Sequence, residues 1–297
     1  MKIIEKVVSD VDDAVKYVFD SVGLSFEVSY INKNKRSDDE AKSSSKHIIC
    51  VSTHSGCVMG CKFCHLTGES TGMTQLAPSA IMDAIEIIYK EQIKGKEEKE
   101  ILISFMGSGE PMMSTQVIIS VMEMINENMT GQNIRFALAT MLPDTSSSRL
   151  ALFELAEEVK KNKYNLKIHL SLHFTVNDTR KEWMPNASDI RPSIAALEYY
   201  NKLTRNEVEI HYTLIDKVND KLTDLNWLVN LLKGRDIPVK FLKFNPTDNS
   251  NFNPSDKSVF VWFRDYLYHH DIMSEYYEPN GADVGASCGQ FKLEHYN

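Results

Sequence analysis

The chain has 297 residues, of which 42% are hydrophobic and 25% charged, a composition typical of a folded globular protein and not of a disordered one. Its longest apolar stretches, such as residues 101–106, are too short to cross a bilayer, and the N-terminus lacks the apolar core of a signal peptide. The net charge of −8 excludes a general electrostatic grip on nucleic acid. We therefore expect a cytoplasmic protein without a membrane partner, which would meet RNA only through a local basic patch.

The first elements in chain order form a short extension. Residues 1–31 combine a helical spacing of apolar residues from Ile4 to Val15 with an alternating strand-like segment, residues 26–31. Residues 32–46 are polar and rich in serine, which predicts a mobile loop. We divide the chain into this extension, residues 1–45, and a core, residues 46–297.

From residue 46 onward, apolar β-type runs alternate with amphipathic helical stretches, which predicts six strand–helix units. The expected strands are 47–53, 100–106, 133–140, 166–172, 208–215 and 239–244, and the expected helices are 78–93, 115–128, 148–162, 190–205, 222–233 and 254–270. Successive units of this kind imply a parallel sheet with helices outside, because parallel strands need crossover connections. The fold class is therefore α/β, and a partial (βα)6 barrel fits better than a doubly wound sheet. Chemistry is expected at the C-terminal ends of the strands.

Three of the five cysteines, Cys57, Cys61 and Cys64, fall on one loop after the first expected strand of the core. This cluster suits metal ligation in a reducing compartment better than a disulfide framework. Thiolates bind zinc or iron–sulfur clusters, and closed sites normally take four protein ligands. The spacing leaves two alternatives: a zinc knuckle completed by His54 or His65, or an iron–sulfur cluster with one iron left open.

The cysteine loop, CVMGCKFC with Phe63 between the last two cysteines, resembles the CxxxCxxC pattern of the radical S-adenosylmethionine (SAM) superfamily. The resemblance implies that Cys57, Cys61 and Cys64 hold a [4Fe–4S] cluster whose open iron binds SAM. It further implies reductive cleavage of SAM to a 5′-deoxyadenosyl radical, and a partial barrel fold.

Six motifs in order resemble the RlmN/Cfr family of RNA adenine methyltransferases. They are CVSTHSGC at 50–57, FMGSGEP at 105–111, SLH at 171–173, DKVND at 216–220, NP at 245–246 and GASCGQ at 285–290. The resemblance implies SAM contacts from the residues that match the family's binding motifs, namely Gly109, Glu110, Thr140, Ser171, Leu172, His173 and Asn245. A small-residue turn at 107–110 would let the backbone approach SAM.

The same resemblance gives the remaining two cysteines separate roles. It implies that Cys288 is methylated by one SAM and, after hydrogen abstraction with a second SAM, adds its methylene carbon to an adenine. Cys50 would then help to remove a proton and would release the RNA adduct by forming a disulfide with Cys288. Glu27 matches a glutamate that serves the family as proton acceptor. An exposed carboxylate at a strand edge is the alternative for Glu27.

The implied activity is RNA methylation at C2 of adenine, on rRNA or tRNA, by a monomer that receives electrons from a donor such as flavodoxin or ferredoxin. Methylation at C8 and a radical reaction on a protein or small molecule stay open as alternatives. From the short stretch ahead of Glu27 and the acidic composition, we expect no counterpart of the family's N-terminal RNA-binding domain. Basic stretches at 33–36, 160–163 and 180–181 are candidate phosphate contacts, although solvated surfaces explain such runs as well.

Overall fold

The computed structural model describes residues 1–33, 45–67, 72–96, 99–246, 250–287 and 289–291. Its main sheet runs in the order β1-β2-β3-β4-β7-β8-β9-β10-β11-β12. All pairs from β4 to β12 are parallel. These strands are β4 (Lys46–Val51), β7 (Glu100–Phe105), β8 (Ile134–Thr140), β9 (Leu166–Ser171), β10 (Val208–Leu214), β11 (Val239–Lys243) and β12 (Ser274–Tyr277). The six predicted strands are thus present, and β12 adds a short strand that was not predicted.

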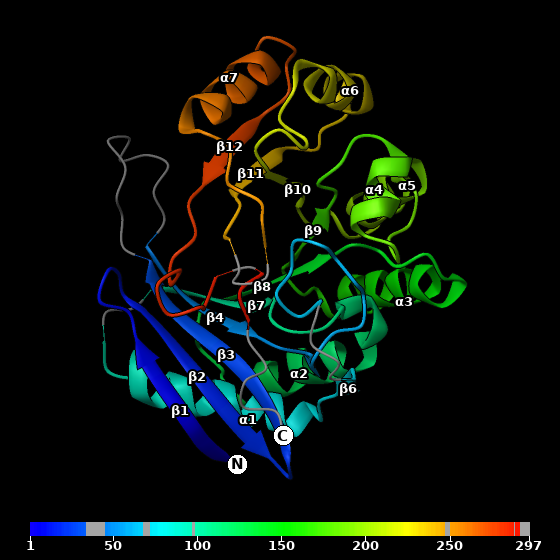
Figure 1. Cartoon of the computed structure of the whole chain (residues 1–297). Coiled ribbons are helices and arrows are strands. Elements are labelled where there is room, and N and C mark those ends of the chain that lie inside the picture. The colour runs from blue at the N-terminus through cyan, green and yellow to red at the C-terminus, as the bar shows by residue number, and fades with distance from the viewer. Residues whose placement is uncertain (34–44, 68–71, 97–98, 247–249, 288, 292–297) are drawn as a thin grey trace.

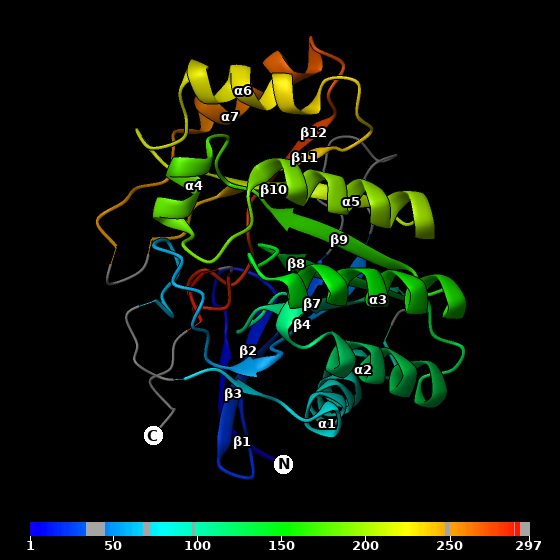
Figure 2. The ribbon, with the colours of Figure 1, turned by 90° about the vertical axis from the view of Figure 1, so that its right-hand side faces the viewer.

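Helices cover the outer face of this curved sheet, as Figures 1 and 2 show. They are α1 (Pro78–Ile88), α2 (Thr115–Asn128), α3 (Ser146–Asn162), α4 (Asn177–Trp183), α5 (Ile190–Thr204), α6 (Leu222–Leu232) and α7 (Lys257–Tyr268), with a π-helical turn η1 (Tyr89–Ile93) and a 3-10 turn η2 (Pro111–Met113). Alternate strand residues such as Ile103 and Ile210 pack with the helices in one buried apolar cluster. The predicted partial barrel is confirmed, with β12 and β4 at opposite ends of its parallel segment.

The N-terminal extension is not helical, which corrects the first prediction. It forms β1 (Lys2–Val8), β2 (Ala14–Ser21) and β3 (Leu24–Lys33), which pair antiparallel with one another, and β3 pairs antiparallel with β4. Valine and isoleucine favour strands, and the turn at residues 9–13 interrupts the apolar spacing that suggested a helix. The extension therefore continues the sheet of the barrel. Most of the predicted mobile loop, residues 34–44, lies outside the described residues.

The inner face of the parallel strands is more polar than the helix-facing side. Lys167, His169 and Ser171 alternate along β9 with leucine and isoleucine residues that face the helices. A two-stranded sheet of β5 (His54–Ser55) and β6 (Thr74–Gln75) follows β4. Among the described helices, we find none with the length and apolarity required to cross a membrane.

Candidate active site

The three clustered cysteines line one cavity at the C-terminal ends of the parallel strands. Cys64 N donates to Cys61 O at 3.0 Å, and Lys62 N donates to Trp183 O at 2.9 Å, so the loop is anchored to α4. Burial raises the pKa of the Cys57 thiol. Burial, together with the neighbouring Cys64 and Cys57 thiols, raises the pKa of Cys61 well above its ordinary value. Three buried thiolates lie this close together only when a cationic centre replaces their protons. The three cysteines therefore fit a [4Fe–4S] cluster.

The other walls of this cavity come from the ends of β7 to β11. Among the residues predicted to contact SAM, five line it: Gly109, Glu110, Ser171, His173 and Asn245. Methionines at positions 59, 106, 141 and 184 supply much of its apolar surface. The structure therefore gathers residues of three separate motifs around the cysteine loop, as expected for a barrel whose loops carry the chemistry.

Glu110 is almost fully buried at the start of η2, where donors surround its carboxylate. Met112 N and the Thr140 hydroxyl donate to Oε1, and Met141 N donates to Oε2 at 3.2 Å. The Thr140 hydroxyl also accepts from Leu142 N at 2.8 Å. Thr140 thus orients the carboxylate of Glu110, a role that the motif comparison alone did not suggest.

The glycines of the turn before Glu110 are required by the neighbouring strand end. A Cβ on Gly107 would lie 2.6 Å from Ser52 Oγ, and one on Gly109 would overlap the ring of His54. Gly109 has φ of +103°, a backbone conformation that favours glycine. Glycine here serves close packing between two strand ends, and His54, one candidate zinc ligand, packs against this turn.

His173 lies at the end of β9 with φ of +56°. Its Nδ1 accepts from Thr213 N at 3.0 Å, which places the proton on Nε2, because burial lowers the pKa of the ring to about 3. Asn219 holds the residue in place: its Nδ2 donates to His173 O at 2.7 Å and to Thr213 O at 2.8 Å. Thus the DKVND motif stabilises the site through Asn219. The side chain of Leu172, by contrast, packs in the main apolar cluster.

Arg180, on α4, is completely buried, so neither a phosphate contact nor a solvated surface, the two interpretations of its basic stretch, holds for this residue. Its guanidinium donates to Met141 O at 2.9 Å, to Ser171 O at 2.8 Å, to Leu172 O and to Ser188 O at 3.0 Å. It thereby ties the end of β9 to the residue after β8. A charged side chain can be buried in this way only when its donors are satisfied.

Glu27 and Cys50 lie on the barrel-interior face of β3 and β4. Cys50 pairs with Ser29 across the two strands, and Glu27 precedes Ser29 by two residues, so their side chains share one face. Glu27 is 1% exposed, and its Oε1 lies 3.2 Å from Lys16 Nζ on β2. The alternative of an exposed edge carboxylate is therefore wrong, because β2 covers β3.

Cys288 itself lies outside the described residues, but its neighbours are informative. Gly289 lines the same cavity as the three clustered cysteines. Its carbonyl accepts from His65 N at 2.9 Å, and a Cβ on it would lie 3.4 Å from Phe63 O. The C-terminal motif therefore reaches the cysteine loop. Among the described cysteines, no disulfide is formed.

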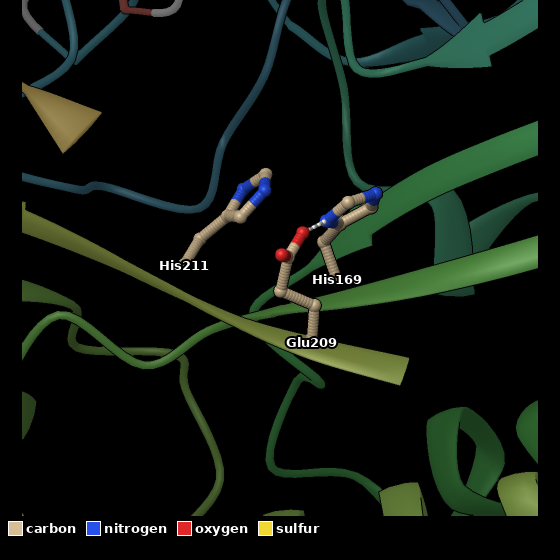
Figure 3. A group of neighbouring side chains, drawn as sticks. All are labelled: His169, Glu209 and His211. Atoms are coloured by element: carbon tan, nitrogen blue, oxygen red, sulfur yellow. Dashed lines mark ion pairs between the residues drawn. The ribbon is translucent and has the colours of Figure 1, made fainter. Parts of the chain in front are cut away.

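A second group of possible metal ligands lies deeper in the barrel. Side chains of His169, Glu209 and His211 converge there, as Figure 3 shows, with their ligand atoms within 4.8 Å of one another. However, Lys240 and Lys167 lie 3.1 and 3.3 Å from Glu209 Oε2. At roughly 5 Å, each ammonium would repel a divalent cation by about 7 kcal/mol with an effective dielectric constant near 20. We therefore interpret these three side chains as part of a network of buried ion pairs around Glu209, which includes Lys167 and Lys240.

The burial of Glu110 gives the cluster-free protein a testable pH dependence. Burial raises the pKa of this carboxyl from 4.5 to about 7. The folded protein therefore binds the proton of this carboxyl more tightly than the unfolded chain does. The resulting stabilisation is fully present below pH 4.5 and is lost as pH rises through about 7. Between pH 4.5 and 7.5, we expect the free energy of unfolding, measured with urea, to fall by on the order of 3 kcal/mol more in wild type than in Glu110→Gln. If the free energies of unfolding of the two proteins changed in parallel with pH, the raised pKa of Glu110 would be contradicted.

Comparison with known proteins agrees with this geometry. The family model of the radical SAM superfamily matches residues 51–226. A dual-specificity RNA methyltransferase RlmN of Sulfurimonas denitrificans is 29% identical, covering 98% of this chain and 81% of the relative. A probable dual-specificity RNA methyltransferase RlmN of Clostridioides difficile is 31% identical, with 84% and 70% covered.

A solved structure shares the fold over nearly the whole chain. A radical SAM methyltransferase from Sphaerobacter thermophilus aligns with a TM-score of 0.83 at 24% identity, covering 99% of this chain and 81% of that one. The match to the radical SAM family model overturns the zinc-knuckle alternative. Its cofactors are a [4Fe–4S] cluster and SAM. The chain is an enzyme of the radical SAM superfamily and belongs to its RlmN family.

Proposed function

We propose that this enzyme methylates an adenine base of RNA, at C2, through an S-methylcysteine formed on Cys288. The observation that carries the proposal is that Gly289, next to Cys288, lines the same cavity as Cys57, Cys61 and Cys64. The RNA methyltransferase names of the relatives support RNA as the substrate. An adenine C2 is electron-poor, so a carbon radical suits it better than polar methyl transfer.

The cavity residues divide the binding of the cofactors between them. Cys57, Cys61 and Cys64 hold the cluster, which when bound supplies the electron for cleavage of SAM. The Glu110 carboxylate, fixed by its donors, is positioned to accept from the amino group of SAM. His173 offers its Nε2–H as a donor, because Nδ1 is already bonded to Thr213 N.

In our proposal, release of the methylated RNA falls to Cys50 and Glu27, on one face of β4 and β3. In our proposal the adduct radical would first give up one electron to the cluster. Cys50 Sγ then attacks Cys288 Sγ to form a disulfide, the bond from Cys288 Sγ to the methylene carbon breaks, the C2 proton leaves the adenine, and the methylene carbon takes up a proton to become the methyl group. Glu27 is the proton acceptor, and its Oε1 lies 3.2 Å from Lys16 Nζ. Both groups are on one strand face, which supports a shared task.

In our proposal, RNA is bound through local contacts and not through a general basic surface. Because the net charge of the chain is −8, we expect weak electrostatic binding of RNA. We therefore propose that a tRNA or an rRNA fragment serves as a substrate as well as an assembled ribosome does. We further propose that the enzyme acts as a cytoplasmic monomer and takes its electrons from a flavodoxin or ferredoxin. A reducing compartment suits both the thiolates and the cluster.

Our proposed division of the chain separates residues 1–45, as an extension, from a core of residues 46–297.

Nucleoside mass spectrometry tests the proposed reaction. Cluster-loaded, reduced enzyme incubated without oxygen with SAM and tRNA or rRNA fragments should produce 2-methyladenosine. The matched control is Cys288→Ala, which should cleave SAM and leave the RNA unmodified. Methylation at C8 would contradict the position, and SAM cleavage without methyladenosine in either RNA would contradict the substrate class and favour a protein or small molecule.

A further inference from the structure

The segment that leads to Cys288 is bonded to the opposite end of the chain. Asp283 accepts from Ser9 Oγ with its two carboxylate oxygens, at 2.9 and 3.0 Å, and from Asp10 N at 3.1 Å. Ser9 lies in the turn between β1 and β2, residues 9–13. Figure 1 shows this red C-terminal segment beside the blue N-terminal strands. One carboxylate thus joins positions separated by more than nine-tenths of the sequence.

A second carboxylate makes the reciprocal contact. Asp12, in the same turn, accepts from Asn280 Nδ2 at 3.2 Å and from Gly281 N at 2.9 Å through Oδ2, while its Oδ1 accepts from Ala14 N at 2.9 Å. Gly281 also fits closely, because a Cβ on it would lie 3.0 Å from that of Ala14. Each side of the contact therefore contributes one charged acceptor and at least one donor from the other side. Charge-assisted bonds of this type are stronger than neutral ones.

The segment between these contacts and the cavity is itself folded. Ala286 N donates to Gly281 O at 2.8 Å, and Ser287 Oγ donates to Asn280 O at 2.7 Å. Beyond it, Gly289 O accepts from His65 N beside the cluster loop. The segment 280–287 is thus fixed at its first half by the N-terminal turn, and the chain just after it is fixed by the cluster loop.

We propose that the β1–β2 turn is a clasp that positions the methyl-carrier segment at the cavity, with Asp12 and Asp283 as its positioning residues. The inference rests on the proposed carrier role of Cys288. It gives the N-terminal strands a task in methyl transfer although their turn lies outside the cavity lining. Loss of the clasp leaves the cluster loop and the SAM contacts of Glu110 and His173 in place, so it affects transfer and not SAM cleavage.

Hydrogen–deuterium exchange of the full, cluster-loaded chain tests the clasp without relying on activity. In Asp283→Ala we expect the Gly281 and Ala286 amides to exchange at least about tenfold faster, because a charge-assisted contact is lost. The rate of Cys288 alkylation by iodoacetamide should change in the same variant. Asp10→Ala is the matched control, since Asp10 takes part through its backbone N–H. Equal exchange in Asp283→Ala and Asp10→Ala would overturn the clasp.

A second pair of variants separates positioning from simple instability. Ser9→Ala removes the hydroxyl that donates to Asp283, while Ser9→Thr keeps it. Faster exchange and slower methyl transfer in Ser9→Ala, with restoration in Ser9→Thr and unchanged SAM cleavage in both, support the clasp. An equal loss of cleavage and transfer would overturn it. If exchange responds as expected but wild type methylates no RNA, the contact between the turn and segment 280–287 stands, and the proposed function and the role of the clasp in methyl transfer fail.

Discussion

Cys50→Ala should accumulate a covalent protein–RNA adduct during turnover, whereas Cys288→Ala should cleave SAM and transfer no methyl group. The difference follows from the order of the proposed steps, because addition of the Cys288 methylene to adenine precedes the step that needs Cys50. Cys50 sits in β4, paired with Ser29 and Ser104, so its replacement leaves the cysteine loop intact. The two variants should therefore fail at different stages of one reaction.

Denaturing gel electrophoresis and intact-protein mass spectrometry measure this difference. Cys50→Ala should shift by the mass of the RNA, and nuclease digestion should leave an adenosine-containing fragment on Cys288. Ser29→Ala is a useful control, because it alters the residue paired with Cys50 and keeps both thiols. Normal yields of free methyladenosine from Cys50→Ala, with no adduct, would show that a different mechanism operates in this enzyme.

Cys61→Ala should lose both the cluster and all SAM cleavage. Wild type reconstituted without oxygen should hold about four irons per chain, since three thiolates complete a four-iron cluster with one open position. Removing one of them takes away a corner ligand that no other described cysteine of the loop replaces. Iron analysis and chromatographic detection of 5′-deoxyadenosine measure the two effects.

Val58→Ala provides the control for this loop. Val58 is 55% exposed between the first two cysteines, so its truncation changes the loop and spares the ligands. We expect near-normal iron and SAM cleavage in that variant. Tight zinc binding in place of iron by the wild-type chain, without SAM cleavage after reconstitution, would contradict the cluster.

The parallel core could be predicted from the sequence because each of its elements has a strong local signature. Helix α2 begins and ends at the predicted residues, 115 and 128. Strand runs such as β10 are buried along their whole length, as expected for a parallel sheet covered by helices. The short elements α4 and β12 were missed, because seven and four residues carry too little periodicity.

The site could be predicted only in part, since some of its residues act through contacts that no local pattern reveals. Arg180 follows the ordinary pattern of a surface cation, and only the tertiary structure surrounds it with carbonyl groups. Asn219 was found as part of a motif, but its bonds to His173 and Thr213 depend on the approach of β9 and β10. Long-range pairing between the two ends of the chain was equally invisible.

The contact between Asp12 and Gly281 also constrains the order in which the molecule is built. The two residues are separated by 269 positions, and a ribosome releases the N-terminal end first. The β1–β2 turn therefore waits for its partner until almost all of the barrel has been synthesised. Until then the cavity lacks the wall that Gly289 supplies. The cysteine loop is therefore synthesised well before Gly289 can complete the cavity that the two share.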